Sequence, residues 1–289
     1  MINKPSRLAL LALLCTGAAT AAHAQATGLP TSQPALLTII REEVKVGRVA
    51  EHARIESGWP AAFEGAKSPD YYLAMVSMTG LNEAWYLIPS ASHAAVAASM
   101  KRDDANATLS AELARLSRAD AEVINNVRTI QAAARPDLSM GAYPNLAKQR
   151  FWEVTIFRVR PGHEQEFAAA AKAYGASAAR AAPSTSFRVY EVVAGMVGPT
   201  YFVFSSVEDY AAFDRMMADG IKTMQGFTAE EMTALQKFST DGMLSSETNR
   251  FRLDPKQSYV SRETRATDTA FWGPPPAPAR PRTGTTSRP

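Results

Sequence analysis

The chain has 289 residues, of which 46% are hydrophobic, 20% charged and 9% aromatic. This composition excludes a collagen-like, coiled-coil or wholly disordered protein, and the length allows one large or two modest domains. The formal net charge of +3 comes from the two ends of the chain: without Lys4 and Arg7 near the start, and Arg280, Arg282 and Arg288 near the end, it is −2. The dense basic stripe that binds a phosphate backbone is missing, so nucleic acid is not an expected partner.

Residues 1–24 are typical of a secretory signal peptide. Two basic residues precede an apolar, alanine-rich stretch, and an Ala-His-Ala segment ending at Ala24 offers a cleavage site before Gln25. The stretch is too short to span a membrane. We therefore expect a periplasmic or secreted protein without a membrane span, in which residues 25–34 form a linker. The single cysteine, Cys15, lies in the leader, so the mature chain would contain no disulfide and no thiolate site.

The C-terminal residues 263–289 are rich in proline and lose the apolar periodicity of the preceding chain. Such a composition buries too little apolar surface to offset the entropy of ordering it. The sequence therefore predicts a disordered tail over these residues.

An internal repeat is the most informative feature of the sequence. When the chain is shifted by 115 positions, residues 47–100 align with later residues without a gap and with 9 identities in 54 positions. Gly47 then aligns with Gly162, and Tyr86 with Tyr201. The predicted elements follow the same order in both copies, which divides the folded part into repeats at residues 35–148 and 149–262.

In chain order, the first copy predicts a strand at 35–46, a helix at 48–63, strands at 71–78 and 84–88, and helices at 93–100 and 109–130. The last helix is inferred from apolar residues spaced by threes, fours and one seven, as one buried helix face requires: Leu109, Leu113, Leu116, Val123, Val127 and Ile130.

The second copy is clearer, because residues 151–160 (FWEVTIFRVR) are rich in β-branched and aromatic side chains, which favour a strand. An alanine-rich helix runs to about residue 182, and strands at 187–194 and 201–205 flank a turn. Helices at 208–217 and 228–238 and a final strand near 258–260 complete the copy. Each repeat thus has the β-α-β-β-α-β order of a ferredoxin-like fold.

Two segments of the second copy carry a resemblance to a known group. The strand end and helix start Arg-Val-Arg-Pro-Gly-His-Glu-Gln-Glu-Phe (158–167), with Ser-Ser-Val-Glu-Asp-Tyr (205–210) opening a later helix, resembles the dimeric α/β-barrel superfamily. That superfamily includes antibiotic-biosynthesis-type monooxygenases and NIPSNAP-like proteins. The resemblance implies an α+β fold in which the two tandem repeats pack sheet to sheet as an intramolecular α/β barrel.

Polar and aromatic residues within strands that are covered on both faces are candidates for lining a cavity. The candidates in the barrel interior are Glu153, Arg188, Tyr190, Tyr201, Trp85 and Tyr86. Alternation along the strand places Arg188 and Tyr190 on one face, toward the other sheet. Two explanations of Glu153 and Arg188 remain. The favoured one is a structural ion pair between them, and the other is a binding site in which aromatic rings stack on a flat organic molecule.

No metal and no cofactor is expected. The mature chain has three histidines, His52, His93 and His163, and none has a metal-binding spacing. Glu56 follows His52 by four residues, but two ligands do not hold a metal, so this pair is interpreted as a surface ion pair. No catalytic residue is assigned.

Three functions remain open. A small-molecule binding module that uses the barrel cavity is favoured, with a small apolar or aromatic ligand as partner and no required oligomer. The alternatives are a cofactor-independent oxygenase or isomerase acting on an aromatic or quinone-like compound, and a structural or interaction protein without a ligand. A cavity holding an acid or base of shifted pKa would favour an enzyme, whereas a filled barrel centre would favour the third function.

Overall fold

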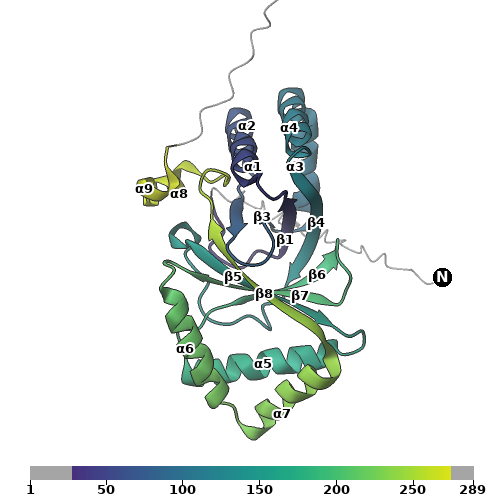
Figure 1. The fold of residues 1–289 in the computed structure, drawn as a ribbon, viewed down its shortest axis with the longest axis vertical. Coiled ribbons are helices and arrows are strands. Elements are labelled where there is room, and N and C mark those ends of the chain that lie inside the picture. Colours follow the sequence, from purple (N-terminus) through teal and green to yellow (C-terminus); the bar gives the residue numbers. More distant parts are fainter. Residues whose placement is uncertain (1–27, 275–289) are drawn as a thin grey trace, which may run out of the picture.

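The computed structural model describes residues 28–274, and Figure 1 shows a central barrel with helices packed at two opposite ends of the molecule. The predicted signal peptide, Cys15 and residues 275–289 lie outside the described residues. Both repeats have the predicted ferredoxin-like order of elements.

Repeat 1 begins with strand β1 (Leu36–Val44). The remaining elements are α1 (Val49–Glu56), α2 (Gly58–Ala66), β2 (Leu73–Ser77), β3 (Glu83–Ser90), α3 (His93–Ala105), α4 (Ala107–Asp120) and β4 (Ile124–Ala134). The helices of this repeat cover the outer face of its sheet, at the upper end in Figure 1.

Repeat 2 begins with β5 (Phe151–Val159) after a short 3₁₀ turn at Leu146–Lys148. The remaining elements are α5 (Glu164–Ala181), β6 (Arg188–Ala194), β7 (Thr200–Val207), α6 (Ala212–Gln225), α7 (Ala229–Lys237) and β8 (Met243–Leu253). Thr228 caps α7 through its side chain, and Glu231 completes a capping box. This start confirms the helix predicted at 228.

The eight strands form one closed antiparallel barrel in the order β1-β3-β2-β8-β5-β7-β6-β4. The last strand of each repeat closes the barrel. Strand β4 pairs with β1 of its own repeat and with β6 of the other, while β8 pairs with β5 and with β2. The predicted intramolecular α/β barrel is thereby confirmed.

The 115-residue shift holds for the first strand, the start of the first helix and the second strand of each repeat. It is lost at the following hairpin, which is two residues longer in repeat 2. There Arg188 pairs with a residue 16 positions on, whereas Leu73 pairs with one 14 positions on. As a result Tyr86 corresponds to Val203, and its predicted alignment with Tyr201 is wrong.

The long helix predicted at 109–130 is also wrong. Helix α4 ends at Asp120, and the chain continues as β4 from Ile124. The helix ends and the strand begins between Leu116 and Val123, the two apolar residues that are seven positions apart. Val127 is 52% exposed and belongs to no buried helix face.

The predicted last strand near 258–260 lies too late in the chain. The strand that closes repeat 2 is β8, and the later segment forms only an isolated bridge between Tyr72 and Tyr259. Residues 245–248 of β8 are exposed and polar, so the strand lacks the alternation that would have revealed it.

The first residues of the predicted tail, 263–272, are ordered, and that part of the prediction is wrong. Residues Arg262–Thr267 and Thr269–Trp272 form two short helices, α8 and α9. Trp272 is buried, and its indole N–H donates to the carbonyl of Ala147 at 3.1 Å. This apolar anchor explains why ordered structure extends into the segment that the composition assigns to the tail.

Candidate functional site

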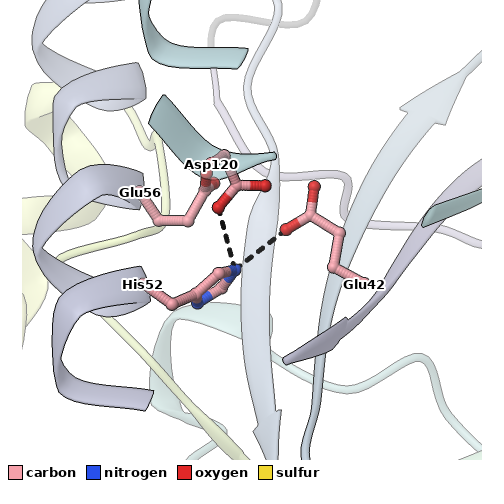
Figure 2. Close-up of side chains that lie close together, drawn as sticks. All are labelled: Glu42, His52, Glu56 and Asp120. Carbon is pink, nitrogen blue, oxygen red and sulfur yellow. Dashed lines mark hydrogen bonds and ion pairs between the residues drawn. The ribbon is translucent and has the colours of Figure 1, made fainter. Parts of the chain in front are cut away.

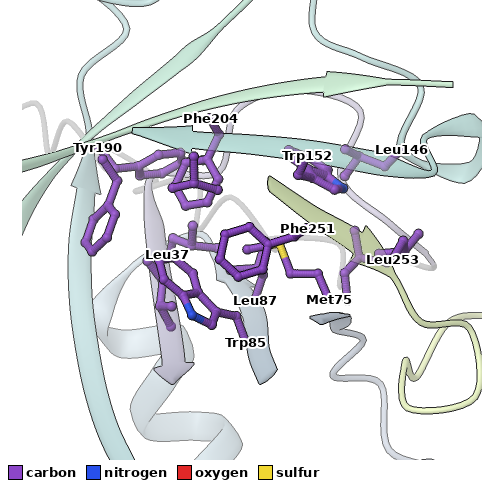
Figure 3. Close-up of a cluster of buried hydrophobic side chains, with 14 of the residues drawn as sticks. Leu37, Met75, Trp85, Leu87, Leu146, Trp152, Tyr190, Phe204, Phe251 and Leu253 are labelled. Carbon is purple, nitrogen blue, oxygen red and sulfur yellow. The ribbon is translucent and has the colours of Figure 1, made fainter. Parts of the chain in front are cut away.

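Aromatic side chains fill the centre of the barrel. Trp85, Phe202 and Phe251 are at most 1% exposed, and the ring centroid of Trp85 lies 4.8 Å from that of Phe251 and 5.9 Å from that of Phe202. Figure 3 shows Trp85 and Phe251 side by side within this cluster. Burying one such ring contributes roughly 2 kcal/mol to stability. The centre is therefore packed core, and a ligand in the barrel has to lie toward one end.

Of the six predicted site residues, three have side chains in the barrel interior or at its end: Trp85, Tyr190 and Arg188. Trp85 is part of the core, and its indole N–H donates to Glu83 at 2.7 Å. Arg41 lies over the Trp85 ring at 4.4 Å and pairs with the same carboxylate. Trp85 therefore has a structural role at the centre.

The other three predicted residues lie on the outer face of the barrel, because strand side chains alternate between the two faces. Tyr86 packs under the helices of repeat 1. Tyr201 packs under the helices of repeat 2, stacked on Phe167 with ring centroids 4.0 Å apart. Glu153 accepts a hydrogen bond from Arg250 at 3.0 Å. Their assignment to the barrel interior is wrong.

The predicted ion pair between Glu153 and Arg188 does not form, because the two side chains lie on opposite faces of the barrel wall. Arg188 is buried, and its guanidinium donates to the carbonyl oxygens of Met140 at 2.5 Å, Phe187 at 2.8 Å and Gly141 at 2.8 Å. Among the described residues no carboxylate pairs with it. Besides these carbonyl oxygens, the guanidinium contacts Ser186 Oγ at 3.4 Å and lies 5.5 Å from the centroid of the Tyr143 ring.

A small pocket opens beside Arg188 at the end of the barrel where β1 and β5 begin. We call it the barrel-end pocket, with a volume of about 60 Å³. Its walls are mainly apolar and aromatic, and the N-terminal segment and the connection between the repeats cover it: Leu29, Pro30, Pro34, Leu37, Leu73, Leu87, Tyr143, Pro144, Leu146, Trp152, Arg188, Tyr190 and Phe204. The indole nitrogen of Trp152 is buried there and has no hydrogen-bond partner in the described residues. Trp152, whose indole N–H has no acceptor in the described residues, and Arg188 are thus both part of a mainly apolar wall.

A second arrangement lies outside the barrel, between the outer face of β1 and helices α1 and α4. We call it the His52 cluster: Glu42, His52, Glu56 and Asp120 (Figure 2). One ligand atom from each of the four side chains lies within 4.8 Å of each of the others. His52 Nε2 is 3.0 Å from Glu42 Oε2 and 3.6 Å from Asp120 Oδ1. All four residues are buried.

Local packing explains how the fold gathers these groups. His52 and Glu56 are four residues apart on α1 and therefore share a helix face. Gly58 allows α4 to approach, since a Cβ at this position would lie 2.6 Å from a methyl carbon of Leu116. Asp120, the last residue of α4, is thereby brought opposite His52.

Burial raises the pKa of each of the three carboxyl groups. It raises the pKa of Glu56 to about 8, with the charges of Glu42 and Asp120 adding to the effect. The pKa of Glu42 rises to about 7 and that of Asp120 to about 6, in both cases mainly through desolvation. Because three negative charges in one buried space repel one another, the three carboxyl groups do not all ionise unless a cation binds between them.

The sequence interpretation of His52 as a surface residue is wrong, since its exposed fraction is 2%. The prediction that no metal binds relied in part on this interpretation, and that part of its support is removed. Glu42 and Asp120 were missed because they are distant in sequence from each other. The internal repeat contains a signal that could have indicated this cluster, because polar residues in repeat 1 align with apolar residues in repeat 2. The shift of 115 positions aligns Glu42, His52 and Glu56 with Phe157, Phe167 and Ala171.

No helix within residues 28–274 is long and apolar enough to cross a membrane. The feature that could hold a metal or cofactor there is the His52 cluster. The barrel-end pocket could hold a small organic molecule.

No protein-family model matches this sequence, and no curated protein is similar to it. Solved structures with a similar fold do exist. A proposed monooxygenase from Fusobacterium nucleatum has a TM-score of 0.50 and 11% identity, covering 76% of this chain and 93% of that one. An anthrone oxidase-like protein has a TM-score of 0.50 and 14% identity, covering 78% of this chain and 94% of that one. At these identities the likeness concerns the fold alone, and the fold is the one that the sequence resemblance predicted: like these two structures, this chain forms a ferredoxin-like α+β barrel.

Proposed function

We propose that the protein binds a small organic molecule in the barrel-end pocket. The observation that carries this proposal is a mainly apolar wall that also contains Arg188, Trp152 and two serines, Ser186 and Ser206. The guanidinium of Arg188 has no carboxylate partner in the described chain, and the Trp152 indole N–H is buried without an acceptor. Buried donors normally find partners, so an acceptor from a ligand would complete this wall.

The chemistry of the wall defines the ligand class. Tyr143, Trp152 and Tyr190 offer aromatic faces, while Arg188 favours a negatively charged or strongly accepting oxygen. The ligand proposed is therefore a compact apolar or aromatic molecule that carries one carbonyl, phenolate or carboxylate oxygen.

The size of the pocket sets a condition on binding. Its volume of about 60 Å³ holds a few water molecules but not a ring system. An aromatic ligand would need the cover formed by Leu29, Pro30 and Pro34 to move outward. These residues belong to the N-terminal segment before β1 and are not part of the barrel wall.

Native mass spectrometry of protein purified from its own host tests the proposal, because a retained ligand would appear as a defined added mass. Trp152→Phe keeps the ring and removes the N–H, and should lower the affinity by roughly fivefold to tenfold, as loss of one hydrogen bond of about 1 kcal/mol implies. Trp59→Phe is the matched control, because its indole nitrogen is also buried without a partner in the described chain but lies outside this pocket. Equal affinities of Trp152→Phe and wild type, or no ligand from any preparation or aromatic-acid screen, would refute the proposal.

Oxygenation of the bound molecule is the second candidate function. It is favoured by the fold likeness to the proposed monooxygenase and the anthrone oxidase-like protein. Oxygen consumption in the presence of the identified ligand decides between binding alone and oxidation.

A further inference from the structure

The His52 cluster has no role in the barrel-end pocket, since none of its residues lines that pocket. We propose that this cluster binds one divalent transition-metal ion through His52 Nε2 and one carboxylate oxygen each of Glu42, Glu56 and Asp120. The site would lie wholly within repeat 1, between β1, α1 and α4.

The geometry fits an ion. Metal–ligand distances of about 2.1 Å place the ligand atoms of a tetrahedral ion about 3.4 Å apart and opposite ligands of an octahedral ion about 4.2 Å apart. The four ligand atoms lie within 4.8 Å of one another, so the most widely spaced pair has to close by about 0.6 Å for an octahedral ion and by up to about 1.4 Å for a tetrahedral one. Figure 2 shows the imidazole and the carboxylates converging on one point from a strand and two helices.

Two oxygens of the cluster lack a hydrogen-bond partner in the described residues. Glu56 Oε1 and Asp120 Oδ1 are buried and accept no hydrogen bond within the described residues, and both side chains are more than nine-tenths buried. A buried acceptor left unpaired costs about 1–3 kcal/mol, and more if it is charged. Asp120 Oδ1 lies 3.6 Å from His52 Nε2, and Glu56 offers one carboxylate oxygen to the same space, where a cation would satisfy the two carboxylates together.

Charge leads to the same conclusion. Within the described chain, the only ion-pair partner of Glu42 and of Asp120 is His52, and Glu56 forms no ion pair. Asp120 also lies at the C-terminal end of α4, where the helix dipole is negative and disfavours a carboxylate. One divalent ion would balance two of the three buried carboxylates.

Repeat 2 shows that the fold does not need this cluster. At the positions of Glu42, His52 and Glu56 it has Phe157, Phe167 and Ala171, which belong to an apolar core. The rings of Phe157 and Phe167 pack there with centroids 5.7 Å apart. An apolar core is the simpler solution for packing a helix on a sheet, so the polar set in repeat 1 requires another explanation, and metal binding supplies it.

The ligand set indicates the class of ion. One imidazole nitrogen with carboxylate oxygens is a mixed N/O set that suits Zn²⁺, Fe²⁺ or Mn²⁺, whereas Mg²⁺ and Ca²⁺ prefer oxygen ligands alone. The site should therefore bind Zn²⁺ more tightly than Mg²⁺.

The experiment uses the untagged chain, stripped with a chelator and titrated separately with Zn²⁺, Mn²⁺ and Mg²⁺. Stripped wild type should bind about one Zn²⁺ per chain by elemental analysis after gel filtration, and its Tm should rise on binding. Glu56→Gln and Asp120→Asn keep side-chain size but lose a charged ligand, and each should bind at least about tenfold more weakly, since even outer-shell changes cost roughly that much.

His163→Gln is the matched control, because His163 and Glu166 form a partly buried His–Glu pair at 3.7 Å in repeat 2. Its Zn²⁺ binding should equal that of wild type. If a cluster variant fails to fold, the absorption spectrum of Co²⁺-loaded wild type gives an independent reading of imidazole and carboxylate ligation. Absence of saturable binding to folded, stripped wild type, or binding that is lost in His163→Gln and kept in Asp120→Asn, would overturn the proposal.

Discussion

Leu116 lies directly against Gly58, where helix α4 crosses the junction between α1 and α2. A Cβ at position 58 would be 2.6 Å from Leu116 Cδ2, closer than packed carbon atoms approach. The absence of a side chain at Gly58 thus sets the distance between α1 and α4, and with it the distance from His52 to Asp120.

Gly58→Ala should lower the free energy of unfolding by roughly 1–3 kcal/mol, as overpacking in a closed contact does. Gly175→Ala is its control: Gly175 lies inside α5 with nothing within 4 Å of an added Cβ, so alanine there should stabilise the protein by roughly 0.5–1 kcal/mol. Urea unfolding of the two variants checks the pair. A Gly58→Ala variant as stable as wild type would show that α4 moves away freely.

Arg188 should matter for stability independently of Glu153. Arg188→Met leaves the carbonyl of Gly141 without its donor and removes one of the two donors to the carbonyl of Met140, and should cost roughly 2–4 kcal/mol. Glu153→Gln should cost less than about 1 kcal/mol, because its pair with Arg250 is partly exposed. A double-mutant cycle should give no coupling between Glu153 and Arg188, and a measurable coupling between Glu153 and Arg250. Coupling of more than about 1 kcal/mol between the first pair would contradict the structure.

The metal-free protein should lose stability as the pH rises from about 5 to 8. Burial raises the folded-state pKa values of Glu42 and Glu56 from 4.5 to about 7 and about 8, so the folded state holds protons that the unfolded state has released. The stabilisation from these protons is fully present below about pH 4.5 and is lost as the pH passes the folded-state pKa values.

Chemical denaturation of the stripped protein at several pH values measures this effect. The variant Glu42→Gln with Glu56→Gln should show a flatter profile between pH 5 and 8. A wild-type profile that rises over this range, or one identical to that of the variant, would argue against buried proton uptake by the two carboxyls.

Cleavage is expected between Ala24 and Gln25 when the protein is made in a host with a secretory pathway. The intact mass of the exported protein should correspond to a chain that starts at Gln25. A mass that includes residues 1–24, or a lipid added to Cys15, would contradict the expected processing.

Local pattern was enough to predict most elements. The β-branched and aromatic run of β5 and the alanine-rich α5 are legible without any tertiary contact, because each has one strong periodicity. Strands β4 and β8 could not be predicted from the sequence pattern. The first half of each strand is mostly polar and exposed, and each segment forms a strand because it pairs with a neighbouring strand on both sides.

The candidate site was less accessible to sequence reasoning than the fold. Glu42 and Asp120 are 78 positions apart and meet only because α4 packs on α1. His52 and Glu56 were noticed as a pair, but their burial depends on that same packing. Arg188 and Tyr190 were placed on the correct face of β6 from alternation alone, whereas the partner of Arg188 depends on the loop after β4, which no strand pattern describes.

The pairing of edge strands between the two repeats has a consequence for the stability of each repeat on its own. Strand β2 of repeat 1 finds its second neighbour in β8, and β6 of repeat 2 finds its second neighbour in β4. A cut in the connection between the repeats would leave each fragment with two open sheet edges and an uncovered aromatic face. The covalent connection holds these surfaces at an effective concentration on the order of millimolar, so that they meet within one molecule before they meet those of another. The two repeats thus pair within one chain as two subunits would pair in a dimer. Because each repeat depends on the other for its sheet edges, the two should unfold in a single transition.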